Sequence, residues 1–321
     1  MSLGKYIRLS SGALMPQIGL GTWLSQPREV EFAVEIAIRN GYRHLDLAKV
    51  YENQHEVGAA LKKVIPSVVT RDDLFITSKL WNTAHRPEFV EAALDDTLAE
   101  LGVDYLDLYL IHFPISFIPS KESYPKDEAG NGPIIDAVPS LVDTWKAMLA
   151  LPKTKVRAVG VSNFTIEYLE AVTAATGVAP VVNQIEAHPL LPQDDLRAYC
   201  EANNIQIVAY SPLGNNTIGK PRIIDHPVVA EVAKKLNVTS AQVLIAWDFA
   251  RGYAVIPKSV NEERIKSNFQ QVELPKEDYD KVTSIGIGNR TRYLTPYTVG
   301  WDINVYGEQD EEGATHKVKI Q

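Results

Sequence analysis

The sequence predicts an α/β protein in which residues 1–321 form a single (β/α)8, or TIM, barrel domain. Strand-like and helix-like apolar patterns alternate along most of the chain, and eight strand candidates can be counted. No linker or change in composition divides this series, which favours one barrel over two doubly wound domains. A doubly wound dinucleotide-binding domain also needs a Gly-x-Gly-x-x-Gly turn, and here Leu24 replaces the third glycine after Gly19 and Gly21.

The elements are predicted in order from the N-terminus. Residues 6–21 hold two short alternating apolar runs around a Ser-Gly pair, which indicates a β-hairpin that leads into the first strand. The other strands are expected at residues 44–46, 74–79, 105–112, 158–162, 181–186, 206–211 and 253–257. Helices are expected where apolar residues recur every three to four positions, at residues 28–40, 52–64, 87–101, 140–149, 166–174, 193–202, 228–236, 240–251 and 261–268.

Two segments are longer than a plain barrel needs. Residues 113–138 follow the fourth strand and are rich in proline and glycine, and the tail at residues 286–321 is rich in aromatic residues. Long loops in compact domains are usually functional or disordered, and loops after barrel strands overhang the catalytic face. We therefore expect residues 113–138 to overhang that face and the tail to contribute to the substrate pocket.

Composition restricts the function classes. Hydrophobic residues make up 45% and charged residues 22% of the chain, as in ordinary globular proteins. No apolar run approaches the roughly 20 residues that span a bilayer, and the first residues lack a secretory signal, so we expect a cytoplasmic protein. The single cysteine, Cys200, fits a reducing compartment. A net charge of −8 argues against nucleic acid or an anionic membrane as the partner.

Asp46 and Tyr51 lie where the strand at residues 44–46 gives way to a helix. Considered alone, the pair is more simply explained as a solvated aspartate and a packed tyrosine. Lys79 follows Asp46 by 33 positions, however, and His112 follows Lys79 by another 33. Because the C-terminal ends of barrel strands meet at one face, this spacing predicts that the three residues converge there with Tyr51.

This group of side chains suits protonation of a carbonyl oxygen while a hydride reaches the carbon. A free phenol, with a pKa of about 10, is a weak acid near neutrality unless a cation stabilises its phenolate. We expect Lys79 to supply the cation and Asp46 to keep Lys79 charged and oriented. A neutral His112 would donate to the substrate oxygen. The sequence contains no evident metal-ligand cluster, and this chemistry needs none.

A hydride source requires a cofactor site, and residues 256–269 contain a cluster of basic groups that suits a phosphate. Lys258 ends the eighth strand, Ser259 precedes the next helix, and Arg264 and Asn268 lie one turn apart on that helix. Other strand ends offer a ring for stacking and groups that could hold an amide, namely Tyr210, Ser162, Asn163 and Gln184. Together these residues predict a nicotinamide dinucleotide lying across the barrel mouth.

Several motifs identify a resemblance. GYRHLDLAKVYENQHEVG, LFITSKLWN, YLDLYLIHFP, VGVSNF, NQIEAHPLL, VAYSPLG and IPKSVNEERIKSNF occur in the order typical of aldo-keto reductases, and the chain resembles that family over residues 7–269. The resemblance implies that Tyr51 is the general acid and that Asp46, Lys79 and His112 complete a tetrad. It also implies NADPH rather than NADH, with the 2′-phosphate held by Lys258, Ser259, Arg264 and Asn268.

The resemblance also implies the remaining contacts. The carboxamide would bind Ser162, Asn163 and Gln184, and Tyr210 would stack on the nicotinamide. Further cofactor contacts are implied at Gly21, Thr22, Trp23, Ser211 and Leu213. The substrate pocket would be lined by Trp23, Val50, Trp81, Phe113 and Phe117.

Two positions depart from well-known aldose reductases. Leu24 replaces a lysine that latches the loop after the seventh strand over the cofactor, which predicts a cofactor that is released faster. Phe113 replaces a tryptophan of the animal enzymes and changes one wall of the pocket.

The tail and the segment IIDAVPSLVDTWKAM are similar to the fungal glycerol dehydrogenase and glyceraldehyde reductase branch of the family. We therefore expect reduction of a short aldehyde such as glyceraldehyde to its polyol, the reverse oxidation, and a monomer or weak dimer. Xylose or erythrose reduction is the near alternative. A non-catalytic NADPH-binding regulatory barrel, and an isomerase or aldolase that uses Lys79 as a Schiff base, are the more distant ones.

Overall fold

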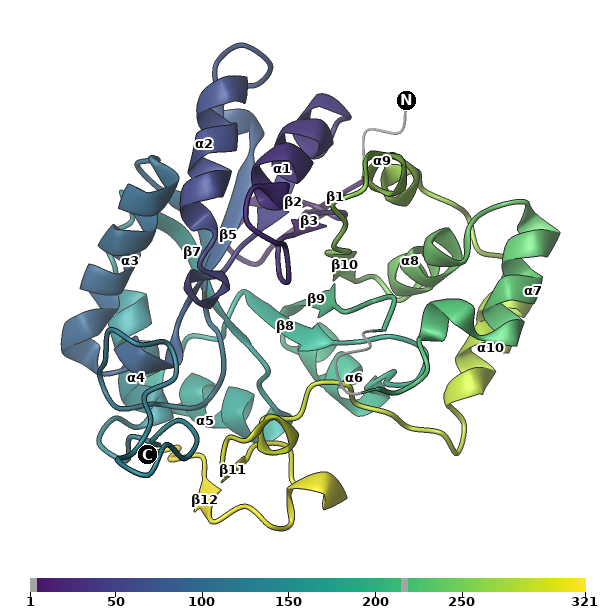
Figure 1. The fold of residues 1–321 in the computed structure, drawn as a ribbon. Coiled ribbons are helices and arrows are strands. Elements are labelled where there is room, and N and C mark those ends of the chain that lie inside the picture. Colours follow the sequence, from purple (N-terminus) through teal and green to yellow (C-terminus); the bar gives the residue numbers. More distant parts are fainter. Residues whose placement is uncertain (1–4, 215–218) are drawn as a thin grey trace.

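The computed structural model describes residues 5–214 and 219–321. Within them, one eight-stranded parallel sheet has its strands in chain order from β3 to β10 (Figure 1). Parallel bridges between Ile18 and Val255 and between Gly21 and Lys258 join the two edges, so the sheet closes on itself. At this seam a Cβ on Gly21 would lie 2.8 Å from the Ile256 carbonyl oxygen, so closure depends on glycine there. The predicted (β/α)8 barrel is confirmed.

The predicted elements lie close to the observed ones. The barrel strands are β3 (Leu20–Gly21), β4 (His44–Asp46), β5 (Phe75–Leu80), β6 (Leu106–Ile111), β7 (Val156–Ser162), β8 (Val182–Glu186), β9 (Gln206–Tyr210) and β10 (Ala254–Val255). The helices around them are α1 (Glu29–Arg39), α2 (Gln54–Val64), α3 (Pro87–Leu101), α4 (Leu141–Ala150), α5 (Ile166–Thr176), α6 (Asp194–Ala202), α7 (Pro227–Leu236), α8 (Ser240–Ala250), α9 (Glu262–Phe269) and α10 (Lys276–Thr283).

The barrel interior is filled by side chains, and the N-terminal hairpin contributes to it. Strands β1 (Tyr6–Arg8) and β2 (Leu14–Pro16) pair antiparallel, as the sequence predicted. Leu9 and Met15 of this hairpin are buried in one cluster with residues from β5 to β10, among them Phe75, Leu108 and Val208. A filled interior leaves the loops beyond the strand ends as the place for a ligand.

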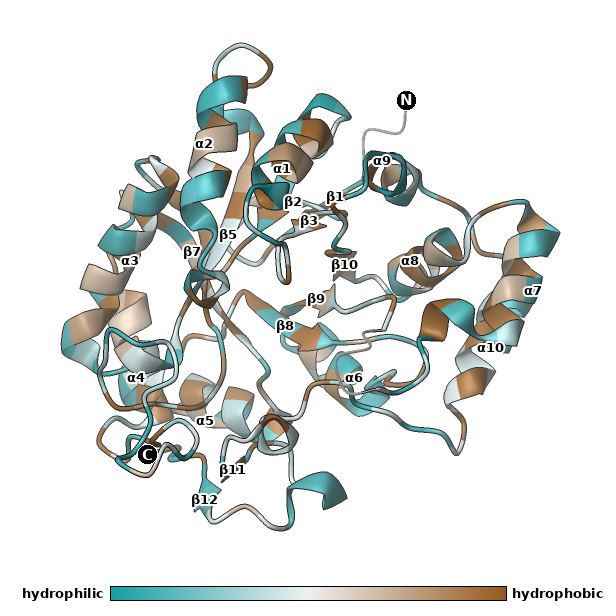
Figure 2. Cartoon of the chain, in the orientation of Figure 1, coloured by the Kyte–Doolittle hydropathy of each residue, from teal (hydrophilic) through white to brown (hydrophobic). Residues whose placement is uncertain are grey.

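The outer layer consists of helices that bury one stripe against the strands. In α1 the buried residues recur at helical spacing, at Val30, Ala33, Val34, Ala37 and Ile38. Figure 2 shows both hydrophobic and hydrophilic residues on the surrounding helices, as expected for elements with one face in the core. None of the helices in the described part of the chain is long and apolar enough to cross a membrane.

Some elements differ from the predictions. Helix α10 was not expected. Pro275 and the two acidic residues in its first turn are helix-start signals, but only Asp278 and Val282 are buried along it, so the sequence has no apolar stripe that indicates a helix. The tail also forms a two-stranded parallel sheet of β11 (Ile303–Asn304) and β12 (His316–Lys317), which is too short to produce an alternating pattern. The helix expected at 52–64 begins at Gln54, because residues 49–51 form a 3₁₀ turn.

Asp248 on α8 gives a stability prediction. Its side chain is buried, and neither carboxylate oxygen has a hydrogen-bond partner within residues 5–214 and 219–321. Burial raises the pKa of Asp248 well above its ordinary value, and Arg251 only partly opposes this. The protonated Asp248 carboxyl therefore holds its proton more tightly in the folded state than in the unfolded chain. The protein is most stable when this group is protonated, and that stability is lost as pH rises from about 4 through the raised pKa.

Asp248→Asn should raise the unfolding free energy by about 1–3 kcal/mol at pH 8, and the gain should shrink toward pH 4. Urea denaturation at the two pH values measures this. The exposed Asp310→Asn serves as the control and should change stability by less than about 0.5 kcal/mol. A gain that is equal at both pH values would contradict the explanation.

Candidate active site

A cavity of about 850 Å³ opens at the C-terminal ends of the barrel strands. The loops after β3, β4, β5, β6, β7 and β9 and the C-terminal tail all contribute residues to its lining. The predicted site residues that line it are Gly21, Thr22, Trp23, Asp46, Val50, Tyr51, Trp81, His112, Phe113, Ser162, Asn163, Gln184, Tyr210, Ser211, Leu213 and Lys258. Most of the predicted site residues therefore lie around one cavity, as expected if the strand ends converge.

Asp46 and Lys79 form a buried ion pair at the base of this site. Lys79 Nζ lies 2.5 Å from Asp46 Oδ1, and the lysine side chain is 0% exposed. Lys79 also donates to the Leu47 carbonyl, and Gln184 donates to the second Asp46 oxygen at 2.6 Å. Burial lowers the pKa of Lys79, and Asp46 opposes that shift. Since β4 and β5 are adjacent strands, the one-repeat spacing brings these two groups together.

Tyr51 ends the 3₁₀ turn that follows β4, and its ring centroid lies 5.3 Å from Lys79 Nζ. Burial, followed by the charge of Asp46 and by Tyr124, raises the pKa of Tyr51 well above its ordinary value. This differs from the expectation that Lys79 would make the phenol a stronger acid. The first reason is that the phenol is buried, and the second is that Asp46 neutralises the ammonium, so the pair presents little net positive charge to the ring. Tyr51 is accordingly a protonated donor throughout the neutral range.

His112 packs among aromatic rings beside Tyr51. Its ring stacks on Phe113 at 5.3 Å and meets the edges of Trp81 and Tyr51 at 5.2 and 5.8 Å. Burial, followed by the charges of Lys79 and His85, lowers the pKa of His112 well below its ordinary value. The imidazole is therefore neutral at physiological pH and keeps one N–H to donate.

Polar groups of β7 and β8 form a connected amide-rich wall. Ser162 Oγ donates to the Gln184 carbonyl at 2.9 Å, and Asn163 Nδ2 donates to the His112 carbonyl at 2.9 Å. Tyr210 O–H donates to Asn163 Oδ1 at 2.7 Å, which orients the tyrosine ring beside this wall. The arrangement suits a ligand that carries both a flat ring and an amide.

Only one of the four predicted phosphate residues lines the cavity. Lys258 lines it and donates to the Leu24 carbonyl at 2.9 Å, while Ser259, Arg264 and Asn268 lie outside the lining. Burial lowers the pKa of Lys258, Glu29 raises it, and the nearby charge of Arg264 lowers it further. Among the described residues Arg264 has no carboxylate partner. Two neighbouring cations that both lack a carboxylate partner among the described residues suit an anion in this region.

The loop after β9 contributes to the lining of the cavity. Ser211 and Leu213 line the cavity, but residues 215–218 of the segment SPLGNNTIGK lie outside the described residues. The side chain at Leu24 is 54% exposed and apolar, so it offers no charge with which to latch this loop.

The substrate end of the cavity differs from the prediction at Phe117. This residue is 1% exposed, does not line the cavity and instead packs behind Trp81 and Trp301 at 5.9 and 5.2 Å. The sequence could not reveal this orientation, since Phe117 lies in an irregular loop without a periodic pattern. The wall is completed by residues that the sequence did not single out: Tyr124, Lys126, Pro133, Leu294, Val299 and Trp301.

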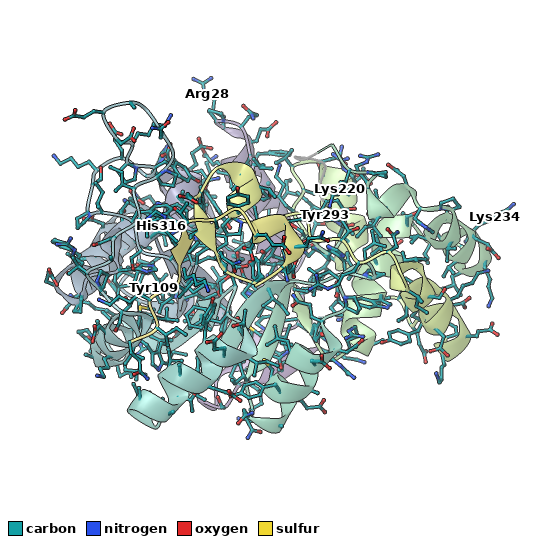
Figure 3. The ribbon with its side chains drawn as sticks, turned by 90° about the horizontal axis from the view of Figure 1, so that it is seen from below. Arg28, Tyr109, Lys220, Lys234, Tyr293 and His316 are labelled. Carbon is teal, nitrogen blue, oxygen red and sulfur yellow. The ribbon has the colours of Figure 1, made fainter. Side chains whose placement is uncertain are left out.

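Figure 3 shows the molecule from below, with Tyr293 and His316 of the C-terminal tail labelled. Hydrogen bonds attach this tail to the end of β8. The fully buried Glu186 accepts hydrogen bonds from the backbone N–H groups of Tyr293 and Leu294 at 2.7 and 2.8 Å. Burial favours the neutral acid, but the hydrogen bond from His188 and the charge of Arg292 outweigh it, so the pKa of Glu186 lies below its ordinary value. This carboxylate fixes the segment that leads to Trp301.

The cavity also fits the cofactor that the sequence predicts. Its lining includes the amides of Asn163 and Gln184, the ring of Tyr210 and the ammonium of Lys258, which suits a ligand that carries an amide-bearing ring and a phosphate. The part of the chain that the structure covers contains no group of three or more His, Cys, Asp or Glu side chains that could hold a metal ion.

Comparisons with known proteins agree with this geometry. The model of the "Aldo/keto reductase family" matches residues 17–287. The chain is 51% identical to the "D/L-glyceraldehyde reductase" of Hypocrea jecorina over 100% of both chains. It is 43% identical to the "Glycerol 2-dehydrogenase (NADP(+))" of Saccharomyces cerevisiae over 88% of this chain and 90% of the relative. The solved aldose reductase of Schistosoma japonicum is 37% identical with a TM-score of 0.86, covering 96% of this chain and 98% of that one.

Proposed function

Because the chain belongs to the aldo/keto reductase family, we propose that it reduces short-chain aldehydes and aldoses with NADPH and catalyses the reverse oxidation of the polyol. The observation that carries the proposal is the buried Asp46–Lys79 pair next to a protonated Tyr51 and a neutral His112, at one cavity. These groups can donate a proton to a carbonyl oxygen and stabilise the charge that develops on it.

In this mechanism Tyr51 is the general acid. NADPH, when bound, supplies the hydride to the carbonyl carbon. Tyr51 gives its phenolic proton to the carbonyl oxygen, so one C–H and one O–H bond form as the C=O double bond is lost. The Lys79 ammonium, 5.3 Å from the ring centroid, offsets part of the cost that burial and Asp46 impose on the phenolate, until the phenolate takes a proton from water. His112 donates its N–H to the same oxygen and fixes the direction of approach.

The cofactor would lie with its amide at Ser162, Asn163 and Gln184 and its flat ring on Tyr210. Gly21, Thr22, Trp23, Ser211 and Leu213, which also line the cavity, would contact the rest of the dinucleotide. The 2′-phosphate would be held by Lys258, Ser259, Arg264 and Asn268. The unpaired charge of Arg264 beside Lys258 supports this choice, because NADH lacks the phosphate that would neutralise it.

Arg264→Ala should weaken NADPH binding about tenfold while NADH affinity changes by less than about twofold, because a charge-assisted hydrogen bond to the phosphate is lost. Fluorescence titration of both nucleotides measures the two dissociation constants. Lys266→Ala on the same helix is the control, since Lys266 already pairs with Glu262 at 2.8 Å. Equal losses for NADPH and NADH in the Arg264 variant would remove the 2′-phosphate assignment.

For the substrate we propose glyceraldehyde and similar short aldehydes, with erythrose and xylose as the alternatives. The relative that is 51% identical and carries the name D/L-glyceraldehyde reductase supports this order. Following NADPH absorbance with glyceraldehyde, erythrose, xylose and an aromatic aldehyde tests it. Absence of turnover with every aldehyde, despite NADPH binding, would favour the regulatory barrel instead.

We also propose that residues 1–321 act as one catalytic unit, in the cytoplasm, as a monomer or weak dimer. The buried state of the single cysteine, Cys200, supports a chain that needs no disulfide. The tail residues Leu294, Val299 and Trp301 at the cavity support a role of residues 286–321 in the substrate pocket.

A further inference from the structure

Asn163 uses its whole side-chain amide in contacts within the protein. Its Nδ2 donates to the His112 carbonyl at 2.9 Å and to Ser162 Oγ at 3.1 Å. Its Oδ1 accepts from the hydroxyls of Tyr210 at 2.7 Å and Tyr306 at 3.2 Å. An amide has two N–H donors and two acceptor lone pairs, so all four positions are filled. Turning the amide over would set Oδ1 against the His112 carbonyl, and its orientation is therefore fixed.

Tyr306 belongs to the C-terminal tail and is held in place by contacts that do not involve Asn163. Glu311, which is 1% exposed, accepts the backbone N–H groups of Val305 and Tyr306 at 3.0 and 2.7 Å. The guanidinium of Arg292 lies 3.7 Å from the Tyr306 ring centroid, and Glu308 in turn binds Arg292 at 2.8 Å. Contacts to Glu311 and Arg292 therefore direct the Tyr306 hydroxyl toward Asn163, and the position of the tyrosine does not depend on the Asn163 side chain.

The two tyrosines differ in their exposure to the cavity. Tyr210 lines the cavity of about 850 Å³, whereas Tyr306 lies on the far side of Asn163 and faces a second cavity. A ligand amide that binds Asn163 Oδ1 must replace one of the two hydroxyls, since both lone pairs are in use. Tyr210 is the one that faces the ligand, so the bond from Tyr306 is the one that remains.

We propose that Tyr306 is a positioning residue of the nicotinamide subsite, which holds the Asn163 amide in the orientation that receives the cofactor carboxamide. The inference rests on the proposed function, because it takes Asn163 as a carboxamide ligand. It assigns the C-terminal tail a part in cofactor binding in addition to its part in the substrate pocket. Burial raises the pKa of Tyr306, so its hydroxyl stays a donor at any pH at which the enzyme works.

The test compares two ligands in Tyr306→Phe. NADPH carries the carboxamide, whereas adenosine 2′,5′-bisphosphate carries the 2′-phosphate but no nicotinamide. Tyr306→Phe should weaken NADPH binding by about two- to tenfold, the effect of one neutral hydrogen bond, and leave binding of the bisphosphate unchanged. Intrinsic-fluorescence or calorimetric titration gives both dissociation constants without turnover.

Tyr168→Phe is the matched control. Its hydroxyl donates to the Val305 carbonyl at 2.7 Å, so this variant loses a contact to the same tail segment without touching Asn163. It should bind both ligands as the wild type does. An equal loss of NADPH affinity in the two variants, an equal loss of both ligands in Tyr306→Phe, or unchanged NADPH binding in Tyr306→Phe would each overturn the proposal. A wild-type protein that does not bind NADPH would overturn the proposed function itself.

Discussion

Tyr51→Phe should lower kcat for aldehyde reduction by about 10²- to 10⁴-fold, the range expected for the loss of a general acid. The phenyl ring keeps the packing against His112 but has no proton to give to the carbonyl oxygen. NADPH affinity should stay within about twofold of the wild type, because Tyr51 is not one of the residues proposed to hydrogen-bond the cofactor. Steady-state rates together with a binding titration separate the two effects.

Tyr124→Phe is the appropriate control for that experiment. Tyr124 also lines the cavity and contributes to the raised pKa of Tyr51, but it is 43% exposed and lies on the loop after β6. Its loss should change kcat by less than about tenfold, as expected for a group that is not the proton donor. Full activity of Tyr51→Phe, or equal losses in the two variants, would be incompatible with Tyr51 as the acid.

Lys79→Met should destabilise the fold by about 3–5 kcal/mol and abolish most of the activity. The reason is that Asp46, with a side chain 2% exposed, would be left as a buried charge without its ion pair. The double variant Asp46→Asn, Lys79→Met removes both charges and should recover most of the stability, because a buried pair contributes little net free energy. It should not recover the activity.

Urea denaturation and steady-state kinetics measure these two quantities, with Lys155→Met as the control. Lys155 pairs with Glu91 and Asp95 on the surface, so its loss should cost no more than about 1 kcal/mol. A Lys79→Met protein as stable as the wild type would refute the account of the buried pair. Borohydride trapping of an aldehyde on Lys79 in the wild type would instead favour the Schiff-base alternative.

The sequence was sufficient to predict the barrel and to predict that residues distant in the chain lie together at its C-terminal face. Strand periodicity located β4 and β5 to within one residue. Asp46 lies opposite Thr77 on the adjacent strand, and Lys79 is two residues further along the same face, so its side chain reaches Asp46. The roles of these residues stay predictions until the variants are made.

The sequence could not predict features that depend on three-dimensional surroundings. The pKa of Tyr51 is raised by burial together with the charge of Asp46, and neither contribution can be evaluated from residue types. Phe117 was expected in the pocket wall and Trp301 was not singled out, because the positions of both depend on how two irregular segments fold against each other. Helix α10 could not be predicted because it is polar and has no apolar stripe.

The attachment of the tail by Glu186 has a consequence for how specificity could diverge. The Glu186 carboxylate accepts hydrogen bonds from the main-chain N–H groups of Tyr293 and Leu294. Substituting the side chains at these two positions leaves those N–H groups in place. Substitutions between Leu294 and Trp301 can therefore reshape one wall of the pocket while the anchor and the residues that we propose for proton transfer stay as they are. New aldehyde preferences can therefore arise from changes in residues 294–301 alone, while the rest of the tail, including Tyr306, and the barrel strands keep their contacts.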